Sequence, residues 1–164
     1  MRRFLLALVL VAGCGAGGDQ GGKSAEGKGT DLVKRAGLTG LYESEAAPRA
    51  NQMCIIDQGG RASFGIVVWG ANMHSCAGAG EAVKEGAVLR LTMKGDQACA
   101  IEARMEGDKV SLPAAIPAGC SYYCGAQAKL SGATFSFKGG SVEDAVKAKD
   151  LVGEPLCSAS AHRQ

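Results

Sequence analysis

The chain has 164 residues, of which 46% are hydrophobic, only 5% are aromatic and 25 are glycine. Once a targeting segment and a linker are subtracted, this length allows one domain, whose core must be built mainly from aliphatic and small side chains in short elements with many turns. Arg2 and Arg3 account for the formal net charge of +2. The remaining charges therefore balance and give no electrostatic basis for binding nucleic acid or an anionic membrane surface.

The first residues are organised like an export signal. A positively charged start, Met1-Arg2-Arg3, is followed by an apolar run from Phe4 to Ala12. This run is too short to cross a hydrocarbon core of about 30 Å as a stable helix, whereas its length is typical of a secretory signal. We therefore interpret residues 1–13 as a signal peptide.

The signal ends in an aliphatic residue, two small residues and a cysteine, Val11-Ala12-Gly13-Cys14. This tetrapeptide resembles the lipobox of bacterial lipoproteins. The resemblance implies cleavage before Cys14 and acylation of Cys14 with chains such as palmitate, and several acyl chains give the stable anchor that one chain does not. Gly15 stands where the family's inner-membrane retention signal has Asp, which favours the outer membrane, facing the periplasm. The alternative is an ordinary secretory signal, which keeps the export and loses the anchor.

Residues 14–34 are expected to join this anchor to the domain. Residues 15–30 are largely glycine and small polar residues, which cannot bury enough apolar surface to become ordered. We interpret them as a flexible linker, place a single domain at residues 35–160, and assign residues 161–164 to a tail.

From residue 38 onward, apolar and polar residues alternate more often than they follow a helical period, which predicts a mainly antiparallel β structure. Turn chemistry supports hairpins at Gly59-Gly60, Gly95-Asp96 and Gly107-Asp108, because glycine adopts positive φ freely. We expect strands near residues 38–44, 51–57, 62–69, 72–77, 87–93, 98–105, 108–112 and 133–138.

The segment from Ala62 to Trp69 is apolar on both of its faces, which predicts a central strand. Gly65 in its middle indicates a bulge or a close approach of other backbone. Residues 141–151 change to helical spacing, with Ser141 as N-cap and Asp144 completing a partial capping box. We therefore expect one short C-terminal helix over residues 141–151.

Together these elements predict a single small antiparallel β-barrel or β-sandwich of about eight strands with one short C-terminal helix. The succession of hairpins favours the barrel. Gly40-Leu41-Tyr42 is similar to the G-x-aromatic start of lipocalin-like domains, which are also β-barrels.

Six cysteines remain besides Cys14, and an even number in an exported domain predicts a framework of disulfides. Each bridge contributes roughly 2 to 4 kcal/mol. The sequence does not choose among the possible pairings, although Cys54 and Cys76 are disfavoured as partners because the strands that carry them flank a third strand. The candidates are Cys54, Cys76, Cys99, Cys120, Cys124 and Cys157.

Residues with catalytic or metal-binding chemistry do not form a recognisable pattern. The C-x3-C segment from Cys120 to Cys124 and the two histidines of the chain lack the characteristic ligand spacing of a zinc site, and export favours a disulfide there. This spacing is also not the C-x-x-C of thioredoxin-like proteins. His74 and Cys76 form a conceivable thiol pair, but side chains two residues apart on a strand lie about 6 to 7 Å from each other. We predict no catalytic residue, no metal and no cofactor.

Two segments stand out as a possible binding surface. The first runs from Trp69 through His74 to a cysteine and continues into Ala77-Gly78-Ala79-Gly80, which we interpret as a flexible loop. The second places Tyr122 and Tyr123 in a tight turn bounded by cysteines. Rigid aromatic residues in constrained loops are typical of binding hot spots. Their alternative role is to close one end of the core.

The sequence therefore predicts a non-catalytic lipoprotein of the cell envelope that acts as a binding module for a protein or a small molecule. Its general plan is similar to that of bacterial envelope lysozyme inhibitors, which are also small exported disulfide-bonded β-barrels. This similarity implies inhibition of a wall-degrading enzyme such as lysozyme as one alternative function. A thiol-dependent enzyme or redox factor is the other alternative.

Overall fold

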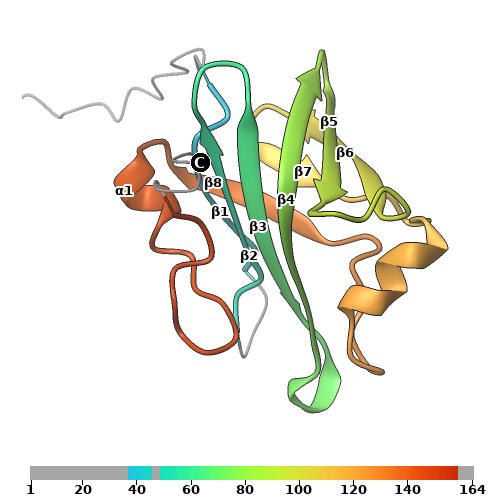
Figure 1. The fold of residues 1–164 in the computed structure, drawn as a ribbon. Coiled ribbons are helices and arrows are strands. Elements are labelled where there is room, and N and C mark those ends of the chain that lie inside the picture. Colours follow the sequence, from blue (N-terminus) through green and yellow to red (C-terminus); the bar gives the residue numbers. More distant parts are fainter. Residues whose placement is uncertain (1–36, 46–48, 159–164) are drawn as a thin grey trace, which may run out of the picture. The chain divides into compact units, whose positions relative to one another are not determined.

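The computed structural model describes residues 37–45 and 49–158. The predicted signal peptide at 1–13, the predicted acylation site Cys14 with the predicted linker, and the tail at 161–164 lie outside the described residues. Eight antiparallel strands form a closed barrel in which each strand pairs with the next and β8 returns to β1 (Figure 1). The predicted mainly β class is confirmed, in the barrel form.

The strands are β1 (Gly40–Glu43), β2 (Gln52–Asp57), β3 (Ala62–Trp69), β4 (Ser75–Glu85), β5 (Val88–Met93), β6 (Ala100–Glu106), β7 (Lys109–Ser111) and β8 (Thr134–Gly139). Two short 3-10 helices interrupt them, η1 (Ala71–Met73) and η2 (Ala118–Tyr123), and the α-helix α1 (Val142–Ala145) follows β8. Most strands match their predicted ranges to within two residues, and the predicted hairpin glycines Gly95 and Gly107 adopt positive φ.

The bounds of strand β4 differ from those predicted from the sequence. We expected a strand over 72–77 followed by a flexible loop, but β4 begins at Ser75 and continues through Ala77–Gly80 to Glu85. Its glycines are explained by close packing, because a Cβ on Gly78 would lie 2.6 Å from Met93 Sδ and one on Gly80 would meet the Thr92 carbonyl. The turn into β5 contains Gly86 at a φ of 61°, which the sequence reading missed.

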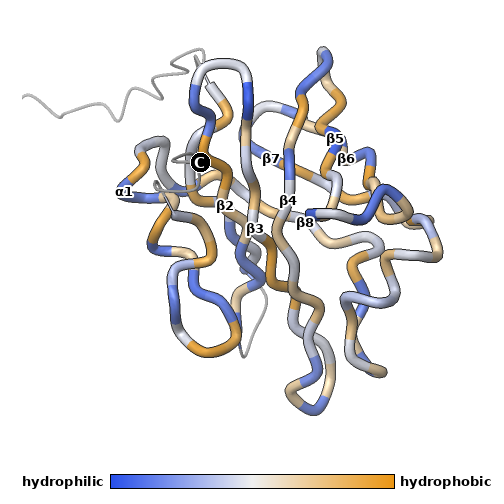
Figure 2. The backbone as a smooth tube through the Cα atoms, in the orientation of Figure 1, coloured by the Kyte–Doolittle hydropathy of each residue, from blue (hydrophilic) through white to orange (hydrophobic). Residues whose placement is uncertain are grey.

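The barrel interior is filled by side chains. Every strand from β1 to β8 contributes at least one buried side chain to one cluster, and buried and less buried residues alternate along β5 and β6 as expected. Figure 2 shows the hydropathy of each residue along these strands. Dense packing of this kind occupies the space that a lipocalin-like ligand would need. The largest fully buried members of the cluster are Tyr42, Met53, Ile55, Phe64, Ile66, Leu89, Leu91, Met93, Ile101, Leu130 and Phe135.

A second apolar cluster lies on the outer face of β1 and β2. Helix α1 and the C-terminal strap, which we define as residues 146–158, cover this face beside β1 and β2 (Figure 1). A Cβ on Gly65 would lie 2.6 Å from Leu156 Cγ, so the predicted close approach at Gly65 is confirmed. Strand β3 pairs with β2 on one side and with β4 on the other, as every strand of the closed barrel has two neighbours. It is buried on both faces partly because the strap crosses it at Gly65. The cluster comprises Leu41, Cys54, Ile56, Ala145, Ala148 and Cys157.

Helix α1 is shorter than predicted. Ser141 accepts a hydrogen bond from the Asp144 backbone N–H at 3.0 Å, and the Asp144 carboxylate accepts one from the Ser141 backbone, which completes the capping box. The helix ends at Ala145 rather than at residue 151. Beyond it, the backbone N–H of Lys149 donates to Gln52 Oε1 at 3.0 Å, so contacts with the barrel replace the helical hydrogen bonds there.

Three disulfides join the cysteines of the domain. Cys54 pairs with Cys157, Cys76 with Cys124, and Cys99 with Cys120. The prediction that Cys54 and Cys76 have partners elsewhere is confirmed. Cys157 ties the strap to β2, whereas the other two bonds hold the long segment between β7 and β8 against β4 and the β5–β6 turn.

Candidate functional site

The four residues predicted as a binding surface lie at one end of the barrel. Trp69 ends β3 and His74 immediately precedes β4, while Tyr122 and Tyr123 end η2. We call this region the loop end and define it as the described parts of residues 44–51, together with 70–74, 94–99 and 112–133. The β2–β3 and β4–β5 turns lie at the opposite end (Figure 1).

A covalent and hydrogen-bonded clip fastens two parts of the loop end together. The Cys76–Cys124 disulfide coincides with an isolated antiparallel bridge between these two residues. The Gly125 N–H donates to the Ser75 carbonyl at 2.9 Å, and the Ala71 N–H donates to the Gln127 carbonyl at 3.2 Å. The loop before β4 and the segment after η2 therefore behave as one preorganised surface.

The tip of the β3–β4 connection has an unusual backbone. Asn72 and Met73 have φ values of 51° and 64°, and the His74 N–H donates to the Ala71 carbonyl at 3.0 Å. Two consecutive positive φ values are typical of a type I′ turn, which glycine and asparagine usually occupy. Methionine in this conformation is strained, and the side chain of Met73 is 59% exposed. The turn thus presents the apolar side chain of Met73 to solvent although its backbone conformation is strained.

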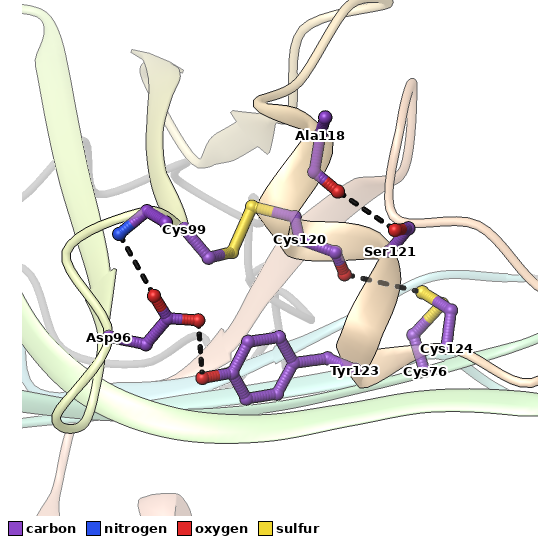
Figure 3. The surroundings of a disulfide bond; sticks show 9 residues. Cys76, Asp96, Cys99, Ala118, Cys120, Ser121, Tyr123 and Cys124 are labelled. Carbon is purple, nitrogen blue, oxygen red and sulfur yellow. Dashed lines mark hydrogen bonds between the residues drawn. A yellow bond between two sulfur atoms is a disulfide. The ribbon is translucent and has the colours of Figure 1, made fainter.

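The two tyrosines have different roles. Tyr123 packs against the barrel core, and its hydroxyl donates to Asp96 Oδ2 at 3.1 Å, beside the Cys99–Cys120 disulfide (Figure 3). Partial burial and the neighbouring Asp96 carboxylate raise the pKa of the Tyr123 hydroxyl above its ordinary value. Tyr122 is 88% exposed, and its ring meets that of Tyr123 edge to face. Tyr123 therefore closes the core, whereas Tyr122 projects from it.

Trp69 lines an open pocket of about 500 Å³ between the end of β3 and the segment that precedes β8. Its backbone N–H donates to Asn51 Oδ1 at 2.8 Å. The guanidinium carbon of Arg49 lies over the indole ring, 4.7 Å from the ring centroid, in the geometry of a cation–π interaction. The other side chains at the pocket that carry hydrogen-bonding groups are Asn51, Gln127, Lys129 and Ser131.

His74 is half-buried and packs on Gly125, where a Cβ would lie 2.7 Å from its Nδ1 atom. Cys76, its conceivable partner for thiol chemistry, is bonded to Cys124. Across the part of the chain that the structure describes, no three side chains of His, Cys, Asp or Glu gather as metal ligands. His74 thus belongs to the wall of the loop end rather than to a catalytic pair.

Several residues of this site escaped the sequence analysis. Arg49, Asn51, Gln127 and Lys129 carry no spacing or motif that marks them, and only the fold brings them to Trp69. Gln127 also accepts a hydrogen bond from the Asn72 side chain at 2.8 Å, which extends the clip across the two segments.

Six large hydrophobic side chains are exposed among the described residues, and two of them, Val83 and Val88, flank the β4–β5 turn at the opposite end. Met73 and Tyr122 lie in the loop end, while Leu151 and the 83% exposed Val152 form the turn of the strap. The backbone of Lys149 is bonded to the start of β2, which places the strap turn near the same end. The loop end and the strap turn thus hold four of the six exposed large hydrophobic side chains, which are candidates for contact with a partner.

Within residues 37–45 and 49–158, the structure has no helix that is both long and apolar enough to cross a membrane. None of the family models, curated proteins and solved structures compared with the chain matches it.

Proposed function

We propose that this protein is a non-catalytic binding module of the bacterial cell envelope, anchored through acyl chains on Cys14 and binding its partner at the loop end of the barrel. The lipobox and the export signal support the anchor. The observation that carries the binding function is the combination of a side-chain-filled barrel with exposed aromatic and apolar residues on a disulfide-clipped surface.

The filled interior favours a macromolecular partner over a small apolar ligand. Small-molecule sites in barrels are concave and enclosed, whereas here buried side chains from all eight strands occupy that space. Exposed Tyr122 and Met73 on a backbone that is already ordered lose little entropy on binding, as hot-spot residues require. A protein partner in the envelope fits this surface best.

Site-specific photo-crosslinking in the living bacterium tests the proposal without knowledge of the partner. A photoreactive phenylalanine analogue replaces Tyr122 in the full chain, and the matched control places it at Val83, which is 51% exposed at the opposite end. We expect a discrete crosslinked species from position 122 that is absent from position 83. Equal patterns from both positions, or no adduct from position 122, would contradict the proposal.

The identity of the crosslinked partner also decides the narrower alternative. Inhibition of a wall-degrading enzyme predicts that the adduct contains such an enzyme and that the purified protein slows its cleavage of cell walls. The Tyr122→Ala variant should then weaken this inhibition, while Val83→Ala should leave it unchanged. An adduct with a different envelope protein would reject the inhibitor function and retain the binding module.

A further inference from the structure

The pocket beside Trp69 combines apolar and hydrogen-bonding surface with positive charge. Trp69 supplies an aromatic surface, and Asn51, Gln127 and Ser131 supply amide and hydroxyl groups. Lys129 lines the same pocket, and among residues 37–45 and 49–158 no acidic residue lines it. Arg49 adds a second positive charge over the Trp69 ring.

The positive charge of Lys129 is available to a ligand. Among the ion pairs between described residues, none includes Lys129, and this residue is exposed. The Asn51 side chain is held in place through its oxygen, which accepts the Trp69 N–H, so its amide NH₂ group remains a donor. The pocket thus has fixed donors and an ammonium group for an anionic, hydroxyl-rich ligand.

We propose that this pocket binds an acidic glycan, in which a sugar ring contacts the face of the Trp69 indole opposite Arg49 and a carboxylate interacts with Lys129. The inference goes beyond the proposed function, because it assigns a glycan to the Trp69 pocket, whereas the proposed protein partner contacts the exposed side chains of Tyr122 and Met73. Sugar rings present C–H faces to an aromatic surface and hydroxyls to amides, and the open pocket of about 500 Å³ has room for such rings.

The closed barrel argues against a peptide in this pocket. Extended peptides are commonly bound by adding a strand to an exposed sheet edge, but each strand from β1 to β8 already has two neighbours. The pocket is open and is lined mainly by small and polar residues around Trp69, so it offers no enclosed apolar slot for the side chain of a peptide. A carbohydrate therefore fits the Trp69 pocket better than an extended peptide does.

Trp69 is the only tryptophan of the chain, so its fluorescence reports on this pocket alone. The full mature protein in detergent is titrated with a disaccharide of N-acetylglucosamine and N-acetylmuramic acid. The neutral control is di-N-acetylglucosamine, which has no lactyl carboxylate, and trialanine supplies a carboxylate without a sugar. We expect a saturable fluorescence change whose affinity is at least several-fold greater for the acidic disaccharide than for either control, and weaker at high salt.

Matched variants locate the charge. Lys129→Met should lower the affinity for the acidic disaccharide about tenfold, to a value close to that for the neutral disaccharide. Lys84→Met, the same substitution beside the opposite end, should leave both affinities unchanged. Equal binding of both disaccharides, tighter binding of trialanine, no response to any probe, or no effect of Lys129→Met would overturn the glycan assignment. None of those results would affect crosslinking of a partner at position 122, so the two experiments test the two proposals independently.

Discussion

Gly65 shows how a single residue determines whether the strap can close over the barrel. A methyl group on Gly65 would lie 2.6 Å from Leu156 Cγ and 2.7 Å from the Leu156 carbonyl oxygen. We expect Gly65→Ala to lower the free energy of unfolding by about 1 to 3 kcal/mol through overpacking. Gly37→Ala is the control, since its Cβ meets nothing within 4 Å. Urea unfolding without reductant measures both, and equal stability of the two variants would contradict this packing.

Tyr122 and Tyr123 are adjacent in the sequence but differ in their contacts. Replacing each in turn by phenylalanine distinguishes their contributions to stability. Tyr123→Phe removes the hydroxyl that donates to Asp96 at 3.1 Å, so it should lower the urea midpoint. Tyr122→Phe removes a hydroxyl from a side chain that is 88% exposed and should leave the midpoint unchanged. The opposite order of effects would show that Tyr123 does not close the core in the way described.

At the scale of elements, the capping box of α1 stabilises a helix of only four residues. Ser141→Ala should destabilise the protein by about 1 kcal/mol, as N-cap removal generally does, whereas Ser158→Ala at the exposed end of the strap should not. Chemical unfolding at neutral pH compares the two variants. Equal destabilisation by the two substitutions would mean that the Ser141 cap does not stabilise α1 against β1 and β2.

The same capping box predicts a dependence on acid pH. Hydrogen bonds from Lys147 and Ser141 lower the pKa of the Asp144 carboxyl below its ordinary value of 3.8. The unfolded chain therefore takes up this proton at higher pH than the native protein does, so the contribution is complete above about pH 4 and is lost as pH falls through the native pKa. Asp144→Asn should flatten this part of the stability profile, and an unchanged profile would reject the assignment.

The disulfide of the strap should contribute more to stability than the one beside η2. Cys54 and Cys157 are 103 residues apart in sequence, whereas Cys99 and Cys120 are 21 apart. On the chain-entropy account, removing the first bond with paired Cys→Ser changes costs about 5 kcal/mol and removing the second about 3 kcal/mol. Thermal and urea unfolding test the order, and a larger loss from the Cys99–Cys120 pair would contradict it.

Local sequence patterns were sufficient for most strands and for the helix start. Ala62–Trp69 was predicted to the residue, because its alternation and its flanking turns are local signals. The far half of β4 was missed because Gly78 and Gly80 resemble loop residues, and their reason is the space occupied by Met93 and the Thr92 backbone on β5. The early end of α1 likewise depends on contacts with β2 that are distant in sequence.

At the scale of the whole molecule, the sequence identified the aromatic members of the candidate site but not its arrangement. Trp69 and the tyrosines were chosen for their chemistry and their cysteine-bounded loops. Their common location depends on the Cys76–Cys124 pairing, one of many pairings that six cysteines allow. Arg49 and Lys129 are far from Trp69 in the sequence, and only the fold of the barrel brings them beside it. No local pattern in the chain therefore marks them.

We propose that the whole molecule is a three-disulfide barrel tethered by lipid outside the cytoplasm. The most direct test of this proposal is the intact mass of the protein from its native membrane, alkylated before and after reduction. We predict a chain that begins at Cys14 with added acyl mass, no alkylation before reduction, and six alkylated thiols from the disulfides afterwards. A chain that retains residues 1–13, lacks acyl mass, or reacts before reduction would contradict the account.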